Sequence, residues 1–272
     1  MLITLTSDIG WQDYLVGAAK GRILQAIPGA GIADVSHQLT PFNYPQAAYV
    51  CQSAFKNFPD FTYHIVLVNL FETKPKQLLL AFHNNQYLLC ADNGLLTMIT
   101  ETRPELVIGL PFQPGRVIDT LHCIDVFAAA IAALAAGNKL ETIGEPDTAF
   151  AEKTPIKPSV GPDWMEAHVI FIDHFENVVL DVTRDNFDEV RKGRNFRIEF
   201  RNKQFINQLS QTYADAAHGD ALALFNAAGY LEISINKGNA AGLLGLNSFV
   251  EQASNSYLQN RLFYNTVKIF FY

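Results

Sequence analysis

The sequence predicts an α/β N-terminal domain with a mostly parallel sheet, followed by a smaller all-β, barrel-like C-terminal domain. Strand-like and helix-like segments alternate through roughly the first 150 residues, the pattern of an α/β domain. One strand, His64 to Asn69, is almost continuously apolar, as in strands buried on both faces. A stretch with three prolines then separates this alternating region from a region of short strands. We therefore expect domains at residues 1–152 and 164–272, joined by a linker at 153–163.

The elements of the first domain follow from local signals. The first helix keeps an apolar period near 3.6 residues, the second has Pro45 in its first turn, and Gly137 closes the last as a C′ residue. Two strands flank His83-Asn84-Asn85 and form a hairpin-like pair. The predicted helices are Asp13–Ala26, Tyr44–Asn57 and Asp125–Ala136, and the predicted strands are Leu2–Leu5, Gly31–Val35, His64–Asn69, Gln77–Phe82 and Gln86–Ala91.

The second domain reads as short strands separated by turn residues, which favours a small barrel or sandwich. A single stretch, Phe205 to Tyr213, is loosely helical. The predicted strands are Ala167–Asp173, Val178–Val182, Asn195–Phe200, Ala221–Phe225 and Tyr230–Ile235.

Composition excludes several classes of protein. Hydrophobic residues make up 49% and charged residues 17% of the 272-residue chain, so a packed core is expected and wholesale disorder is not. The net charge of −7 argues against nucleic-acid binding by phosphate neutralisation. The longest apolar run, Val126 to Gly137, is too short to span a membrane, and the N-terminus has no basic signal-peptide region. The three cysteines read as buried free thiols of a cytoplasmic protein.

The candidate functional residues lie mainly at the ends of predicted strands. Polar residues follow the first three strands as Ser7-Asp8, Asp34-Ser36-His37 and Asn69. In open α/β sheets, ligands bind outside the carboxyl ends of the strands. No phosphate-binding glycine loop follows the first strand, so a dinucleotide site is not expected. Asp8 has two readings: a carboxylate that holds a ribose diol, or a helix cap or Asx turn.

The seven histidines show no metal-ligand spacing, so no metal site is predicted. His122 precedes the predicted helix at Asp125. It has two readings, a general base or a histidine hydrogen-bonded at a helix start.

Several motifs in order resemble one family. They are LTSDIGWQDYLVGAAKGRIL, ADVSHQLTPFN, AYVCQSAFKNFP, CADNGLL, LHCIDVFAAAIAALAAG, IDHFENVV and NAAGYLEISINKGNAAGLLG. Together they resemble the S-adenosyl-L-methionine hydroxide adenosyltransferases, relatives of the fluorinase and chlorinase enzymes. The resemblance covers nearly the whole chain. It implies a homotrimer whose ligand lies between the first domain of one subunit and the second domain of the next.

The implied reaction is attack of water or hydroxide on C5′ of S-adenosylmethionine, releasing methionine and adenosine. The sulfonium leaves as a neutral thioether, so the reaction needs no general acid and no cofactor. The enzyme must orient and desolvate the substrate and hold the nucleophile near attack geometry.

The resemblance also assigns roles to individual residues. Asp8 matches the aspartate that holds the ribose hydroxyls, and Asp173 the aspartate near the methionine amine. Asn177 matches the asparagine near adenine, and Asn226 lies in the loop that meets the methionine carboxylate. His122 matches the histidine of the family's Asp-Arg-His set.

The chain departs from the family at the reacting centre. The family's VVDPGVGT.R reads LVNLFETKPK here, so Asn69 replaces the aspartate and Lys76 falls on the arginine. Glu176 and Ala227 also replace a family glycine and serine. An asparagine holds a water but does not take its proton. Three functions therefore stay open: a hydrolase with an eroded catalytic set in which His122, Asn69 and Lys76 carry the water, a weak or inactive adenosine- or S-adenosylmethionine-binding protein, and a displacement by another nucleophile.

Overall fold

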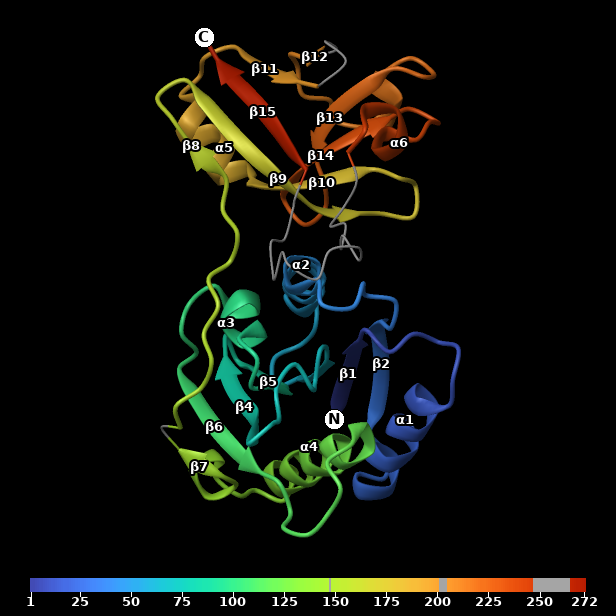
Figure 1. Cartoon of the computed structure of the whole chain (residues 1–272), viewed down its shortest axis with the longest axis vertical. Helices are drawn as coiled ribbons and strands as arrows, with labels where there is room; N and C mark the ends of the chain where they lie inside the picture. The colour runs from blue at the N-terminus through green and yellow to red at the C-terminus, as the bar shows by residue number, and fades with distance from the viewer. Residues whose placement is uncertain (147, 201–204, 247–264) are drawn as a thin grey trace, which may run out of the picture. The chain divides into compact units, whose positions relative to one another are not determined.

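The chain divides into two compact units. The computed structural model describes residues 1–146, 148–200, 205–246 and 265–272. The first unit is Met1–Pro155 and the second is Ile156–Tyr272. Each unit has its own buried apolar residues. Figure 1 labels helices and strands of both units.

The first unit is built on a mixed sheet. Its described strands lie in the order β2-β1-β3-β5-β4-β6-β7. The pairs β1–β2, β1–β3 and β3–β5 are parallel, and β4–β5, β4–β6 and β6–β7 are antiparallel. The strands are β1 (Leu2–Ser7), β2 (Gly31–Ser36), β3 (Tyr63–Leu67), β4 (Gln77–His83), β5 (Gln86–Ala91), β6 (Leu106–Pro111) and β7 (Glu145–Pro146).

The expectation of a mostly parallel sheet is therefore wrong, and the β4–β5 hairpin is the reason. Asn84 and Asn85 have φ of 48° and 60°, values that asparagine tolerates and that a tight two-residue hairpin requires. The hairpin was expected, but β4 also pairs with β6, so the chain adds antiparallel strands on that side of the sheet. β6 and β7 were not predicted.

Helices cover both faces of this sheet (Figure 1). Helices α1 (Leu15–Ala26) and α4 (Thr120–Ala135) share one apolar core with the strands. Helices α2 (Tyr44–Phe55) and α3 (Leu95–Thr100) share the other. The start expected for α4 near Asp125 is wrong, because the Asp119 side chain caps the helix by accepting the N–H of His122 at 2.7 Å. His122 thus belongs to the first turn.

Strand direction brings several loops to one edge of the sheet. β1, β2, β3 and β5 run parallel. β6 shares their direction because both β5 and β6 are antiparallel to β4. The loops that follow these strands therefore lie along one edge, which we call the carboxyl edge. Helix α4 begins at this edge, since it follows β6.

The second unit is a nearly closed antiparallel sheet. Its described strands run in the order β12-β11-β15-β9-β10-β14-β13, with β8 paired to β9. Ser210 donates its N–H to the carbonyl of Ala223 at 2.8 Å, which links the segment after β12 to β13. The strands are β8 (Ser159–Val160), β9 (Trp164–Ile172), β10 (Val178–Thr183), β11 (Phe196–Glu199), β12 (Phe205–Ile206), β13 (Ala221–Phe225), β14 (Tyr230–Ile235) and β15 (Thr266–Phe271).

Two expectations about this unit are wrong. It is not all-β, because α5 (Arg184–Arg191) and α6 (Ala240–Leu244) belong to it, and the fully buried Phe187 of α5 packs against three rings of the barrel. The helix expected at Phe205–Tyr213 is absent: Phe205 and Ile206 pair with β11 instead. A Thr212–Asp215 capping box closes only one 3₁₀ turn, Tyr213–Asp215.

Three further features concern the described residues. No helix among them is long and apolar enough to cross a membrane. Within the same residues, no group of three or more His, Cys, Asp or Glu side chains is placed to hold a metal ion. The three cysteines are free and buried, as expected: Cys51, Cys90 and Cys123.

Candidate functional site

Asp8 stands at the carboxyl edge directly after β1. Its Oδ2 accepts the backbone N–H of Asn69 at 2.9 Å, which joins the loop after β1 to the loop after β3. Burial raises the pKa of the Asp8 carboxyl above its ordinary value, and the N–H of Asn69 offsets part of that rise. Asp8 caps no helix, because the N-cap of α1 is Tyr14. A half-buried carboxylate at a strand end suits a ligand with paired hydroxyls.

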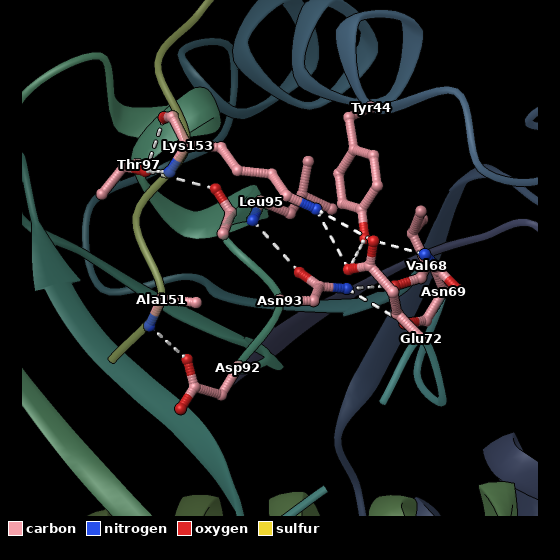
Figure 2. Close-up of polar contacts among 11 residues, drawn as sticks. Tyr44, Val68, Asn69, Glu72, Asp92, Asn93, Leu95, Thr97, Ala151 and Lys153 are labelled. Atoms are coloured by element: carbon pink, nitrogen blue, oxygen red, sulfur yellow. Dashed lines mark hydrogen bonds and ion pairs between the residues drawn. The ribbon is translucent and has the colours of Figure 1, made fainter. Parts of the chain in front are cut away.

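Asn69 begins a chain of polar contacts (Figure 2). Its Nδ2 donates to the hydroxyl of Tyr44 at 2.7 Å, and that hydroxyl donates to Oε2 of Glu72 at 2.6 Å. Asn69 is buried and has a φ of 47°, a left-handed conformation that asparagine adopts more readily than most residues. Burial and the Glu72 carboxylate raise the pKa of Tyr44, so its phenol stays protonated.

Lys153 completes this chain from the far end of the first unit. Its ammonium lies 3.0 and 3.2 Å from the two carboxylate oxygens of Glu72 and 3.7 Å from the centre of the Tyr44 ring. The backbone of Lys153 is tied to Thr97 of α3 by hydrogen bonds of 2.9 and 2.8 Å (Figure 2). We call Tyr44, Asn69, Glu72 and Lys153 the Asn69 chain.

Asn93 holds the backbone of the loop after β3. Its Nδ2 donates to the carbonyls of Val68 and Asn69 at 3.0 and 3.1 Å, and its Oδ1 accepts the N–H of Leu95 (Figure 2). Asn93 is buried, so these contacts are shielded from water. The backbone of Asn69 is thus held from two sides, by Asn93 and by Asp8.

Lys76 and His122 differ in their surroundings. Lys76 is exposed, and the ammonium that meets the Asn69 chain is that of Lys153. His122 is buried, with Nδ1 3.0 Å from the carbonyl of Val117. A carbonyl only accepts, so Nδ1 carries a proton, and in the neutral ring Nε2 presents a lone pair. That Nε2 is buried and has no hydrogen-bond partner within the described residues.

A second polar chain supports Asp8. The buried ring of His37 contacts the Ser7 hydroxyl through Nδ1 at 2.7 Å and the Asp34 carboxylate through Nε2 at 2.9 Å. Lys20 pairs with Asp34 at 2.6 Å. The carbonyl of His37 also accepts the N–H of Gly10 at 2.7 Å. His37 therefore holds the chain just before and just after Asp8.

The predicted residues of the second unit lie in two separate loops. Asp173 accepts the N–H groups of Phe175 and Asn177 at 2.8 Å each and the side-chain amide of Asn177 at 3.0 Å. Asn226 accepts two backbone N–H groups in the turn between β13 and β14. The first loop precedes the Val178 end of β10, and the turn lies by the Thr183 end, about 16 Å away at ~3.3 Å per residue.

Large side chains are exposed beside these residues. Trp11, Phe42 and Phe71 follow β1, β2 and β3 at the carboxyl edge and are about half exposed. Phe175, between Asp173 and Asn177, is 74% exposed. Aromatic faces beside carboxylates and amides suit a ligand with a flat ring and a polar sugar.

Comparison with known proteins places the chain in a family. The family model described as the SAM hydroxide adenosyltransferase N-terminal domain matches residues 3–144, and the model of the C-terminal domain matches residues 167–251. The chain belongs to the SAM hydroxide adenosyltransferase family. The resemblance noted from the sequence motifs is thereby confirmed.

The individual relatives are distant but cover most of the chain. It is 28% identical over 256 residues to (R)-S-adenosyl-L-methionine hydrolase of Methanocaldococcus jannaschii, covering 90% of this chain and 92% of that protein. It is 26% identical over 275 residues to the fluorinase of Actinopolyspora mzabensis, covering 88% and 92%. An uncharacterized conserved protein from Thermotoga maritima has a similar crystal structure, with a TM-score of 0.81, 25% identity and 99% coverage of both chains.

The sequence motifs did not reveal three of the residues that surround Asn69, and they did not reveal the contacts of His37 near Asp8. Glu72 lies three residues after Asn69, a spacing with no periodicity to mark it. Tyr44 reads as an ordinary first residue of a helix, and Lys153 as the start of a linker. His37 was noted as a polar residue after a strand, but its contact with Ser7 depends on the pairing of β1 with β2.

Proposed function

We propose that this protein hydrolyses S-adenosylmethionine by attack of water on C5′, giving adenosine and methionine. The observation that carries the proposal is the hydrogen bond from the N–H of Asn69 to Asp8. It joins the carboxylate assigned to the ribose directly to the residue assigned to the nucleophile. A ribose bound by Asp8 would thus lie beside the loop after β3, whose Asn69 is assigned to the attacking water. Membership of a family with named hydrolases supports the same reaction.

The proposed work of Asp8 is to accept hydrogen bonds from the two ribose hydroxyls. Each such bond to a charged acceptor is worth about 1.5–3 kcal/mol before compensation. The bond from Asn69 orients the carboxylate before the ligand arrives, which reduces the entropy lost on binding.

The proposed step is an in-line displacement. The oxygen of water forms a bond to C5′ while the C5′–sulfur bond breaks, and its electron pair leaves with sulfur as a neutral thioether. Asn69 holds the water, and Nε2 of His122 takes the proton that the water loses. The lone pair of Nε2 and its lack of a partner among the described residues support that role. Lys76 is exposed, so we assign it no more than a supporting charge.

We also propose that the complete site forms between copies of the chain in a homotrimer. Asp173, Asn177 and Asn226 of one copy would meet a ligand held by Asp8 of the next. The exposed Phe175 and the exposed aromatic side chains of the carboxyl edge support this, since each would be covered in such an assembly. Light scattering should give three times the chain mass at micromolar concentration, and a monomer mass would refute the shared site.

A second candidate function is nucleoside binding without turnover. The amide of Asn69 favours it, because an amide does not take the proton of water. Binding without product would distinguish this function from hydrolysis.

The deciding experiment is incubation of the purified protein with S-adenosylmethionine in H₂¹⁸O, followed by mass spectrometry. Hydrolysis at C5′ places ¹⁸O in adenosine and none in methionine. Added chloride tests the displacement by another nucleophile, which would yield a halogenated nucleoside. Asp8→Ala should lose affinity for S-adenosylmethionine in calorimetric titration, whereas Asp60→Ala, a surface aspartate before β3, serves as the matched control. The proposal is refuted if the wild type forms no adenosine and methionine, whether or not it binds S-adenosylmethionine.

A further inference from the structure

The chemistry of the Asn69 chain constrains which way the amide of Asn69 faces. The Tyr44 hydroxyl has one proton, and its neighbours are the Glu72 carboxylate at 2.6 Å and the Asn69 amide at 2.7 Å. Both oxygens of Glu72 contact the Lys153 ammonium, and a carboxylate paired in this way only accepts hydrogen bonds. The proton of Tyr44 therefore goes to Glu72, and the hydroxyl is left to accept from Asn69.

It follows that the amide nitrogen of Asn69 faces Tyr44 and that its Oδ1 faces away. The neighbouring Asn93 contacts only the backbone carbonyl of Asn69, so it does not compete for the side chain. Oδ1 makes no hydrogen bond within the described part of the chain. Lys153, which contacts both oxygens of Glu72 and the face of the Tyr44 ring, holds the other end of the chain in place.

We propose that Tyr44 and Glu72 are positioning residues that turn the carbonyl oxygen of Asn69 toward the attacking water. The inference rests on the proposed hydrolysis. An asparagine oriented in this way presents one acceptor oxygen, as one side of a carboxylate does. It accepts a hydrogen bond from the water and so directs a lone pair of the water oxygen to C5′, while the proton leaves through His122. The opposite orientation would present N–H donors to that water and compete with its attack.

Glu72 and Lys153 would thus have a role beyond that of an ordinary exposed ion pair. An isolated surface ion pair contributes little to stability. Here the pair ends a chain that runs through a buried tyrosine to a buried amide, and the direction of every hydrogen bond in that chain follows from the carboxylate. The linkage also spans the first unit, because Glu72 and Lys153 are 81 residues apart.

The first test is independent of activity. In the full chain labelled with [¹⁵N]asparagine, the side-chain amide signal of Asn69 is identified by its loss in Asn69→Asp. In the wild type, its protons should exchange slowly with water. Tyr44→Phe removes the acceptor and should speed that exchange about tenfold or more, whereas Tyr63→Phe, a tyrosine of β3 that stacks on Tyr87, should not. Unchanged exchange in Tyr44→Phe would overturn the proposal.

The second test uses turnover. Tyr44→Phe should lower kcat about threefold to tenfold with little change in KM, the ratio that one hydrogen bond maintains between two orientations. In the Asn69→Asp background the same substitution should leave kcat unchanged, since a carboxylate has an oxygen on both sides. Equal losses in both backgrounds would refute an orienting role. If exchange responds as expected but no variant forms adenosine, the orientation stands and the proposed function fails.

Discussion

Replacing Asn69 with aspartate should destabilise the protein at neutral and high pH. The Tyr44 hydroxyl would then lie between two carboxylates with one proton to give. Hydrogen bonds of 2.7 and 2.6 Å place those carboxylates about 5 Å apart or less. At that distance and an effective dielectric constant of about 20, their repulsion is about 3 kcal/mol. Solvent around Glu72, whose side chain is 40% exposed, and the charge of Lys153 reduce this to about 1–2 kcal/mol.

The pH dependence of this penalty has a definite sign. Repulsion from Glu72 raises the pKa of the introduced aspartate in the folded state above its unfolded value. The full penalty is therefore present above the raised folded pKa, and it shrinks as the pH falls through that pKa. Urea unfolding of the wild type and Asn69→Asp at pH 8, 6.5 and 5 measures it. The difference in unfolding free energy should be largest at pH 8.

Two variants separate this effect from the lost amide hydrogen bond. Asn69→Asp combined with Glu72→Gln removes one of the two charges and should recover most of the loss at pH 8. Asn69→Ala lacks the new charge and should show a deficit that does not vary with pH. The reasoning is refuted if Asn69→Asp is as stable as the wild type at pH 8, or if Glu72→Gln leaves its deficit unchanged.

Three further outcomes follow from titrating or buried groups. Burial lowers the pKa of His64 from 6.5 to about 4, so the unfolding free energy should fall by up to about 3 kcal/mol as the pH drops from 6.5 to 4, and His64→Gln should lack this segment of the pH profile. The Asp181 carboxylate raises the pKa of His168. The stabilising charge pair is therefore complete below pH 6.5 and is lost as the pH rises through the raised value, so the stability difference between wild type and His168→Asn should shrink from pH 6 to pH 9. Burial raises the thiol pKa of Cys51, Cys90 and Cys123. A thiol reagent at pH 8 should therefore label these cysteines only in denaturant. Rapid labelling of the native protein would contradict their burial.

Local features of the sequence predicted most elements of the first unit because those elements depend on near neighbours. The 3.6-residue apolar period of α1, the proline at the start of α2 and Asn84-Asn85 in the β4–β5 turn all act within a few residues. The same information predicted that Asp8 and Asn69 follow strands. It failed for the helix expected at Phe205–Tyr213, where pairing of Phe205 with Glu199 overrides a weak local preference.

The family and five strands of the first unit were thus predictable from the sequence alone, because motifs and short periodicities depend on consecutive residues. The tertiary structure decided the direction of β4 and β6 in the sheet, and with it the mixed pairing. It also decided which charges meet Asn69. The family resemblance aligns Lys76 with an arginine, and that role stays a prediction. The ammonium that contacts Glu72 and Tyr44 beside Asn69 is that of Lys153, whose backbone is bonded to Thr97 of α3. Contacts over such separations depend on how whole elements pack, and no local pattern in the sequence specifies that packing.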